Sequence, residues 1–296
     1  MNRFSKFIQK NFPYLTLSPA IIILLMLTLF PVIYSVVLSF NELSIEVSQP
    51  TFIGFRNYIQ MLTDDKDFWN GLRLTITYTF LAVSIEFILG FIIASLLNQK
   101  IRFIKVFRLF LILPLVITPV VAGLTWRILY SPSFGLINYF LSLLNIGPKS
   151  WLSQPQTALF AVVFVDVWQW TPFMFLMLYA GLQSLPNEPY EAAFVDGASS
   201  IQILRHITLP LLKNIIVLAM IFRTIDAFLS FDIIFILTKG GPGTATQTLN
   251  MYSFYTGFNW FNLGYTAAIS TIMLVILVFI VWLITRIART SLVGVD

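Results

Sequence analysis

The chain has 296 residues, of which 58% are hydrophobic and only 10% are charged. Because a soluble domain is usually about 25% charged, this composition excludes an ordinary soluble protein and favours membrane-spanning helices. The sequence has no cysteine and a single histidine, His206, which excludes disulfides, thiolate metal sites and histidine-rich metal clusters.

Six long apolar segments predict six transmembrane helices. Each has about 20 or more residues with few charges, as a helix needs in order to cross a bilayer. Prolines inside several segments are tolerable, because neighbouring helices can satisfy the carbonyl groups that proline leaves free. The predicted spans cover approximately residues 14–40, 73–98, 105–130, 157–183, 211–238 and 264–288. We therefore expect an all-α, multi-pass membrane protein with a single membrane domain over residues 1–296.

Lysine and arginine residues predict the orientation of these spans. If the N-terminus is cytoplasmic, eleven basic residues lie on the inner side and four on the outer side, as the positive-inside rule requires. Both termini then face the cytoplasm, and so does the loop between the fourth and fifth spans. This distribution explains the net charge of +5 better than nucleic acid binding does. The inner residues are Arg3, Lys6, Lys10, Lys100, Arg102, Lys105, Arg108, Arg205, Lys213, Arg286 and Arg289, and the outer ones are Arg56, Lys66, Lys149 and Lys239.

The loop of residues 184–210 is polar and predicts two short helices. Gly197 is expected to end the first helix, since glycine takes the left-handed conformation that a helix end often needs. Ser199 and Gln202 have the spacing of a capping box at the start of the second helix. Pro210 is expected to end that helix before the fifth span begins. Spacing alone favours a well-capped connector between two spans.

The same loop contains the motif EAA, then DGA two residues later, then ITLP. This pattern resembles the EAA loop of binding-protein-dependent ABC importer permeases, although Leu204 stands where the family often has an aromatic residue. The stretches FIGFRNY (52–58), NYFLSLL (138–144), FDIIFILTKGGPGTATQT (231–248) and LGYTAA (263–268) resemble the sugar-permease branch, of the maltose-type first subunit. The resemblance implies the ABC importer type I permease fold.

In that family the EAA loop is a coupling helix that docks into a groove on a cytoplasmic ATPase. We keep the name EAA loop for residues 184–210. The residues that the resemblance assigns to ATPase coupling are Glu191, Ala192, Ala193, Asp196, Gly197, Ala198 and Pro210.

The chain shows no phosphate-binding loop of the form GxxxxGK[ST]. The stretches NIGPKS (145–150) and KGGPGT (239–244) lack that spacing and are predicted to be turns outside the cell. We therefore expect no catalytic residues, no bound metal and no cofactor on this chain. ATP and Mg²⁺ are expected on a partner ATPase. His206 is interpreted as a polar residue of the EAA loop.

Ionisable residues inside spans are costly, so they are candidates for functional roles. They are Glu86, Asp166, Arg223, Asp226 and Asp232. At 1.5 Å per residue, Asp166 and Asp226 lie about 24 Å and about 21 Å from the cytoplasmic ends of their spans, so they share a similar depth. Pairing with another helix and lining of a pathway are equally open for Glu86. Arg223 and Asp226 are three residues apart and could neutralise each other.

Aromatic rings and carboxylates suit sugar binding, since rings cover the C–H faces and carboxylates accept hydrogen bonds from hydroxyl groups. Two aspartates disfavour a strongly anionic solute, and Arg223 weakens that preference. Aromatic residues in spans also commonly pack against other helices. The resemblance places solute contacts at Asp166, Gln169, Trp170, Phe173, Asp226, Ala227 and Ser230.

These features predict a permease subunit of an ATP-driven importer for a sugar or polyol in the cytoplasmic membrane of a prokaryote. The expected partners are a second homologous permease subunit, two ABC ATPase subunits, an extracytoplasmic solute-binding protein and the lipid membrane, with no nucleic acid. A self-sufficient secondary transporter or channel is the alternative, but inverted repeats and half-helices, its usual marks, are not seen. An intramembrane enzyme lacks a catalytic constellation.

Overall fold

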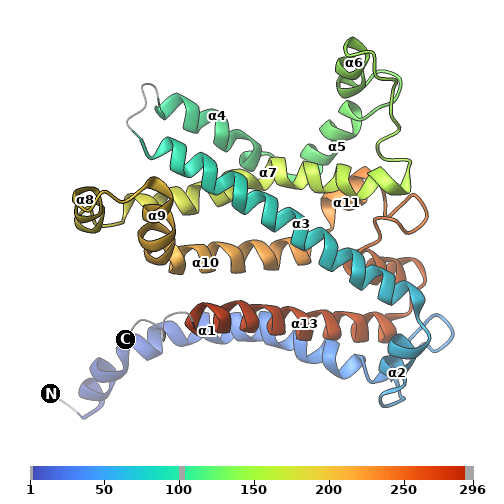
Figure 1. Cartoon of the computed structure of the whole chain (residues 1–296). Helices are drawn as coiled ribbons and strands as arrows, with labels where there is room; N and C mark the ends of the chain where they lie inside the picture. Colours follow the sequence, from blue (N-terminus) through green and yellow to red (C-terminus); the bar gives the residue numbers. More distant parts are fainter. Residues whose placement is uncertain (1–2, 100–103, 291–296) are drawn as a thin grey trace. The chain divides into compact units, whose positions relative to one another are not determined.

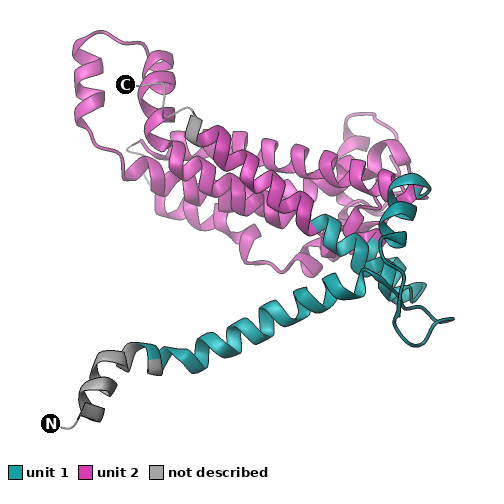
Figure 2. Cartoon of the chain, turned by 90° about the horizontal axis from the view of Figure 1, so that it is seen from below, with its two compact units in different colours: residues 1–65, 253–273 teal, residues 66–252, 274–296 magenta. Residues whose placement is uncertain are grey.

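A computed structural model describes residues 3–99 and 104–290 of the chain, and its regular structure is almost entirely helical. The chain divides into two compact units (Figure 2). Unit 1 contains residues 1–65 and 253–273, and unit 2 contains residues 66–252 and 274–296. Lys100 and Arg102, two of the basic residues expected on the inner side, lie outside the described residues.

Unit 1 contains the long first helix and a small hairpin. Helix α1 (Arg3–Leu38) leads into the antiparallel strands β1 (Asn41–Glu42) and β2 (Thr51–Phe52), followed by helix α2 (Arg56–Thr63). Later in the chain come helix α12 (Leu249–Phe254), the π-helix η2 (Tyr255–Asn259) and helix α13 (Leu263–Thr290), and the unit boundaries fall within α12 and α13.

Two of the sequence motifs meet at strand β1. The Asn57 side chain, from FIGFRNY, donates hydrogen bonds to the carbonyl oxygens of Ser39 (2.9 Å) and Asn41 (3.1 Å). Gly264, from LGYTAA, lies so close to this turn that an added Cβ would be 2.1 Å from the Asn41 carbonyl oxygen. Its backbone N–H donates to the Leu43 carbonyl oxygen at 3.1 Å. The glycine of this motif is therefore required for close packing.

Three long helices form the centre of unit 2. Helices α3 (Lys66–Leu97), α7 (Pro155–Gln183) and α10 (Leu209–Phe228) pack against one another (Figure 1). The backbones of α3 and α7 approach closely at Gly90, where a Cβ would lie 2.7 Å from the Cβ of Met174. Small residues permit this kind of approach between helices inside a membrane.

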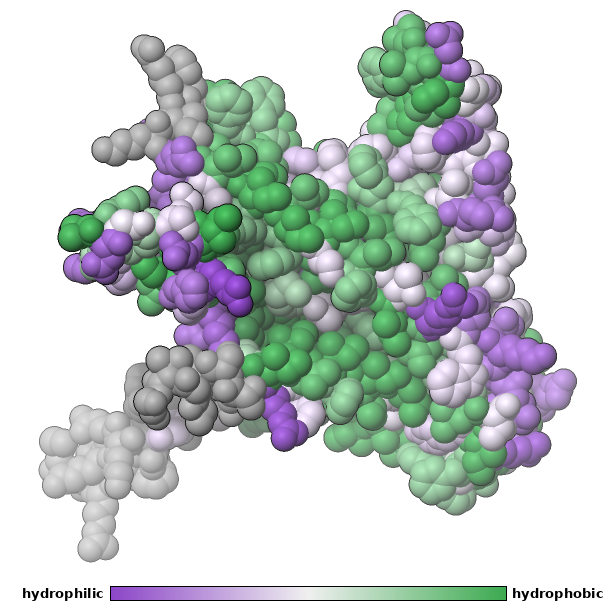
Figure 3. All heavy atoms as spheres, in the orientation of Figure 1, coloured by the Kyte–Doolittle hydropathy of each residue, from purple (hydrophilic) through white to green (hydrophobic). Residues whose placement is uncertain are grey.

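Shorter elements surround these three helices. They are α4 (Ile104–Val116), α5 (Pro119–Leu129), α6 (Leu136–Leu143), α8 (Glu188–Val195), α9 (Ser200–Ile203), the π-helix η1 (Leu204–Thr208) and α11 (Asp232–Leu237). In Figure 3, hydrophobic residues cover the sides of the long helices of unit 2, and hydrophilic residues gather around α8 and α9.

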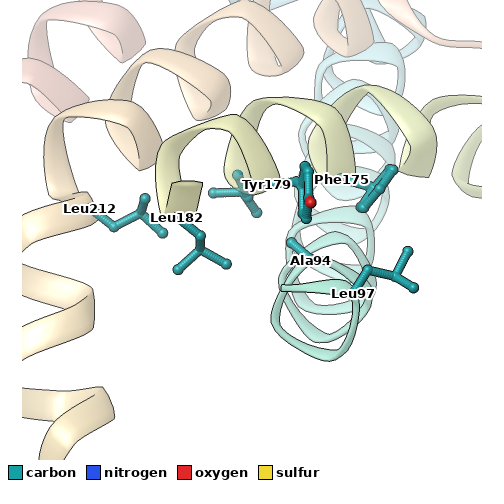
Figure 4. Packing of buried hydrophobic residues seen from close by; sticks show 7 residues of the cluster. Ala94, Leu97, Phe175, Tyr179, Leu182 and Leu212 are labelled. Atoms are coloured by element: carbon teal, nitrogen blue, oxygen red, sulfur yellow. The ribbon is translucent and has the colours of Figure 1, made fainter. Parts of the chain in front are cut away.

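A hydrophobic cluster lies where α3, α7 and α10 meet near the EAA loop (Figure 4). Ala94 and Leu97 of α3 face Phe175, Tyr179 and Leu182 of α7, with Leu212 contributed by α10, and all of them are buried. Because lipid tails are as apolar as these side chains, such a cluster holds membrane helices together through van der Waals packing.

The prediction of six apolar spans is confirmed in number. Among the described residues, five helices are long and apolar enough to cross a membrane, and α4 with α5 makes the sixth when the bent pair is counted as one span. However, the third span is not straight, because α4 and α5 meet at 97°. Pro119 disfavours the helical conformation at the residue before it, and Thr118 is extended with ψ 146°.

The predicted end of the fifth span is wrong. Its helix stops at Phe228, and α11 begins separately at Asp232. The Leu229 carbonyl oxygen at this break accepts a hydrogen bond from the Asn250 side chain at 2.6 Å, which replaces the helical partner that the break removes.

Candidate functional site: the EAA loop and a charged cavity

The EAA loop folds as predicted around its turn. Gly197 has φ +71°, the left-handed conformation that glycine adopts without steric cost. Ser199 and Gln202 form the capping box, since the Ser199 backbone N–H donates to Gln202 Oε1 at 2.8 Å and the Gln202 N–H donates to Ser199 Oγ at 3.4 Å. These bonds fix the direction in which the chain leaves the turn.

Pro210 does not end the second helix, contrary to the prediction. The helix continues from α9 through η1 into α10, and Pro210 lies in the first turn of α10. Proline ordinarily clashes with the carbonyl group four residues earlier. The wider π-turn avoids this conflict, and the Leu209 N–H bonds to the Leu204 carbonyl oxygen five residues back. A single helical rod of 29 residues therefore extends from Ser200 to Phe228.

Most of the residues assigned to coupling are accessible in this chain. Glu191, Ala192, Asp196, Gly197 and Pro210 are exposed, Ala198 is partly buried, and Ala193 is 7% exposed. Three large apolar side chains that sequence reasoning missed are also exposed at this turn, namely Phe194 (70%), Val195 (88%) and Ile201 (76%). A concentrated set of exposed apolar side chains marks an interaction surface.

At the far end of the helical rod, Arg223 is completely buried and binds three carboxylates. Its Nε and Nη2 atoms donate to Glu86 of α3 at 2.6 Å and 2.9 Å. Its Nη2 atom also donates to Asp166 of α7, and Nη1 donates to Asp226 of α10 at 2.7 Å. The two possibilities left open for Glu86 are thus resolved in favour of pairing between helices.

A cavity of about 420 Å³ lies beside this ionic cluster, and we call it the α7–α10 cavity. Its wall is formed by the N-terminus of α5, one face of α7, the end of α10 and the break before α11. It is lined by Pro119, Asp166, Trp170, Phe222, Ile225, Asp226, Leu229, Ser230, Phe231, Asp232 and Ile233.

Four of the seven residues assigned to solute contact line this cavity: Asp166, Trp170, Asp226 and Ser230. Phe173 lies next to Trp170, with ring centres 6.3 Å apart in an edge-to-face arrangement. Gln169 and Ala227 are buried and are not among the lining residues. The Gln169 amide instead donates to the Ile117 carbonyl oxygen at 2.7 Å, a carbonyl that the bend between α4 and α5 leaves without its helical partner.

Two contacts of the cavity wall were missed by sequence reasoning. The Arg223 guanidinium carbon lies 5.0 Å from the centre of the Trp170 ring, within the range of a cation–π interaction. The hydroxyl groups of Tyr78 on α3 and Ser230 lie 3.2 Å apart. Tyr78 has no charge, and its place in a long apolar helix gave no signal of this role.

Comparisons with known proteins agree with these features. Residues 86–291 match the family described as binding-protein-dependent transport system inner membrane component. The chain is 39% identical over 259 residues to the trehalose/maltose transport system permease protein MalF of Thermococcus litoralis, which covers 88% of this chain and 86% of that protein. It is 38% identical over 277 residues to the sulfoquinovosyl glycerol transport system permease protein SmoG of Agrobacterium fabrum. That match covers 93% of this chain and 90% of SmoG.

The fold is similar to that of solved transporter structures. A bacterial ABC transporter involved in the import of the acidic polysaccharide alginate gives a TM-score of 0.84 at 22% identity, covering 98% of this chain and 99% of that one. An alginate ABC transporter in complex with its alginate pentasaccharide-bound periplasmic protein gives 0.83 at 21% identity, covering 98% of each chain. The resemblance found in the EAA loop is therefore confirmed: the chain belongs to the family of inner membrane components of binding-protein-dependent transport systems.

Proposed function

We propose that this chain is a permease subunit of an ATP-driven ABC importer that carries a sugar or polyol across the cytoplasmic membrane by alternating access. The observation that carries the proposal is the continuous helix from Ser200 to Phe228. Its first turns belong to the EAA loop, and its last turns carry Arg223 and Asp226 at the α7–α10 cavity. Movement of the loop is thereby transmitted to the cavity wall.

The sugar assignment is supported by the chemistry of the cavity and by the relatives. The cavity combines the Trp170 ring with the carboxylates of Asp166 and Asp226, and such a wall suits a polyhydroxylated solute. MalF and SmoG, at 39% and 38% identity, are named as transport system permeases for trehalose/maltose and for sulfoquinovosyl glycerol. We infer that Asp166, Trp170, Asp226 and Ser230 contact the solute and that Phe173 supports Trp170.

We further infer that ATP hydrolysis takes place on a separate ATPase dimer, which holds the ATP and Mg²⁺. The complete importer contains a second homologous permease subunit and an extracytoplasmic solute-binding protein. The exposed Phe194, Val195 and Ile201 side chains supply the apolar centre of the ATPase contact, and Glu191 supplies a charge at its edge. An apolar centre with polar groups around it is the usual composition of a protein–protein interface.

Two glutamates of α8 provide a matched test of coupling. Glu188 and Glu191 lie in the first turn of α8 and are both exposed. We expect Glu191→Gln to reduce ATPase co-purification and ATP-driven sugar uptake into proteoliposomes about tenfold or more, as the loss of one side of a charged interface contact does. Glu188→Gln is expected to remain within about twofold of wild type.

The same proteoliposomes test the class of transporter. Uptake by the complete complex must require both ATP and the solute-binding protein. Concentrative uptake by this chain without the ATPase would contradict the proposed function and favour a secondary transporter. Equal losses in the two glutamate variants would contradict the role of Glu191.

A further inference from the structure

The charges around the α7–α10 cavity are distributed unequally between its wall and the interior behind the wall. The Arg223 side chain has 0% exposure, and its donors are directed to carboxylates of three helices. Arg223 is not among the residues that line the cavity. Its positive charge is therefore neutralised behind the wall and is not presented to a solute.

Carboxylates, in contrast, reach the cavity itself. The Asp226 side chain is 50% exposed, and Arg223 binds one of its oxygens, Oδ2. Asp232 is exposed and lines the cavity, as does the buried Asp166. Among the described residues that line the cavity there is no lysine, arginine or histidine. Arg223 binds three carboxylates, of which Asp166 and Asp226 line the cavity, and Asp232 adds a third carboxyl group to the wall.

We propose that the wall contributed by this chain selects solutes by charge, so that the importer carries neutral or cationic polyhydroxylated solutes and discriminates against acidic ones. Arg223 acts as a positioning residue, because it holds Asp226 and the Trp170 ring at the wall without touching the solute. The inference rests on the proposed function and extends it to the substrate class. It also revises the expectation from sequence that Arg223 weakens the rejection of anions.

The physical reason is that carboxylates only accept hydrogen bonds. Hydroxyl and ammonium groups of a solute can donate to Asp226 and Asp232, whereas a solute carboxylate or sulfonate finds no donor of opposite charge there. Clefts lined by charges of one sign concentrate ions of the opposite sign and change association rates by tenfold or more.

The absence of cysteine from the chain allows the charge of the cavity to be measured directly. A Ser230→Cys variant places a thiol at the cavity wall, and Ser142→Cys places one on the exposed surface of α6 as a reference. Each variant, in the complete complex, is reacted with a cationic and with an anionic methanethiosulfonate reagent. Mass spectrometry of the modified peptide gives the two rates, and their cation-to-anion ratio is compared between the two positions.

We expect the ratio at position 230 to exceed the ratio at position 142 by about tenfold. Adding Asp226→Asn or Asp232→Asn to Ser230→Cys should lower the ratio severalfold, whereas adding Arg127→Lys, an arginine that does not line this cavity, should leave it unchanged. A ratio at position 230 equal to or below the reference, or one insensitive to both aspartate substitutions, would overturn the proposal.

A matched pair of sugar derivatives, one neutral and one acidic, then tests whether the charge of the cavity wall affects solute binding. Maltitol and maltobionate both have an open-chain second unit and differ at its terminal carbon, which is a hydroxymethyl group in maltitol and a carboxylate in maltobionate. Each is tested for its ability to slow labelling at position 230. Stronger protection by maltitol, with the difference reduced by Asp226→Asn, supports the proposal, and equal or stronger protection by maltobionate overturns it. If neither compound slows labelling while the labelling ratio at position 230 remains high, the wall is negatively charged as proposed, but the solute is not a sugar or polyol as the proposed function requires.

Discussion

Arg223 connects three helices of unit 2 through one guanidinium group. Removing a charge from water costs several kcal/mol, and the cost is offset only when the remaining hydrogen-bonding groups are satisfied. The planar group has five N–H donors in a fixed arrangement, so it can bind carboxylates from several directions at once. Its contacts with Glu86 of α3, Asp166 of α7 and Asp226 of α10 use this geometry.

Loss of Arg223 alone should therefore be severe. We expect Arg223→Gln to lower the free energy of unfolding by about 3–5 kcal/mol, because it leaves buried carboxylates without a counter-ion. The double variant Arg223→Gln with Glu86→Gln should lose less than the sum of the two single variants. Unfolding of the purified complex in a denaturing detergent measures these changes.

Arg127→Gln is the control for this cycle. Within the described part of the chain, the Arg127 side chain is bonded only to a backbone carbonyl oxygen, that of Ile236 at 3.3 Å. The substitution should cost about 1 kcal/mol or less. Strictly additive effects of Arg223→Gln and Glu86→Gln would show that the two side chains are not coupled.

The sequence identifies the members of this cluster but not their pairing. Ionisable residues in apolar segments stand out, and Arg223 with Asp226 is visible as a local pair. Glu86 lies 137 residues from Arg223 and Asp166 lies 57 residues away. Whether they meet depends on how α3 and α7 are rotated, and close packing at Gly90 sets that rotation in three dimensions.

At the scale of elements, the second half of the EAA loop and α10 form one continuous helix. The turn at Gly197 sets the angle between α8 and the helical rod, and the capping box begins the rod at Ser199. The π-turn of η1 lets the rod pass Pro210 without a break. π-turns inserted in helices occur frequently at functional positions.

Gly197→Ala tests the importance of this angle. An added Cβ would have no heavy atom within 4 Å, so the cost is conformational and amounts to about 1–2 kcal/mol for a left-handed residue. We expect weaker binding of the ATPase and a lower ratio of sugar transported to ATP hydrolysed in the reconstituted importer.

Gly147→Ala is the matched control, because that glycine also has open space and its φ is not in the left-handed region. It should leave the transport ratio at the wild-type value. If Gly197→Ala also leaves the ratio of sugar transported to ATP hydrolysed unchanged, the turn at Gly197 has no role in coupling.

The sequence predicts the elements that are defined by local chemistry. The cap at Ser199 and the turn at Gly197 are correct because their signals lie within a few residues. The break at Leu229 is missed because the group that satisfies its carbonyl oxygen, the Asn250 side chain, lies 21 residues away. Pro119 is visible in the sequence, but a proline in a span is compatible with both a gentle kink and the observed bend of 97°.

For the whole molecule, the distribution of basic residues predicts which loops share a side of the membrane. We expect Ser200→Cys, on the EAA loop, to react with an impermeant thiol reagent only from the cytoplasm, and Ser142→Cys, on α6, only from outside. Both serines are exposed, and the chain has no cysteine of its own.

Labelling of intact cells and of inverted membrane vesicles measures the two positions independently. Reaction of both thiols from the same side would contradict the predicted orientation, and with it the access of a cytoplasmic ATPase to the EAA loop.

The length of the helical rod from Ser200 to Phe228 determines how far its end moves when it tilts. At 1.5 Å per residue its 29 residues span roughly 43 Å, which is comparable to the thickness of the bilayer. Tilting such a rod by about 5° about one end displaces the other by about 4 Å, more than the working range of a hydrogen bond. A small tilt of the rod at the EAA loop is thus enough to replace one set of hydrogen bonds at the Phe228 end with another.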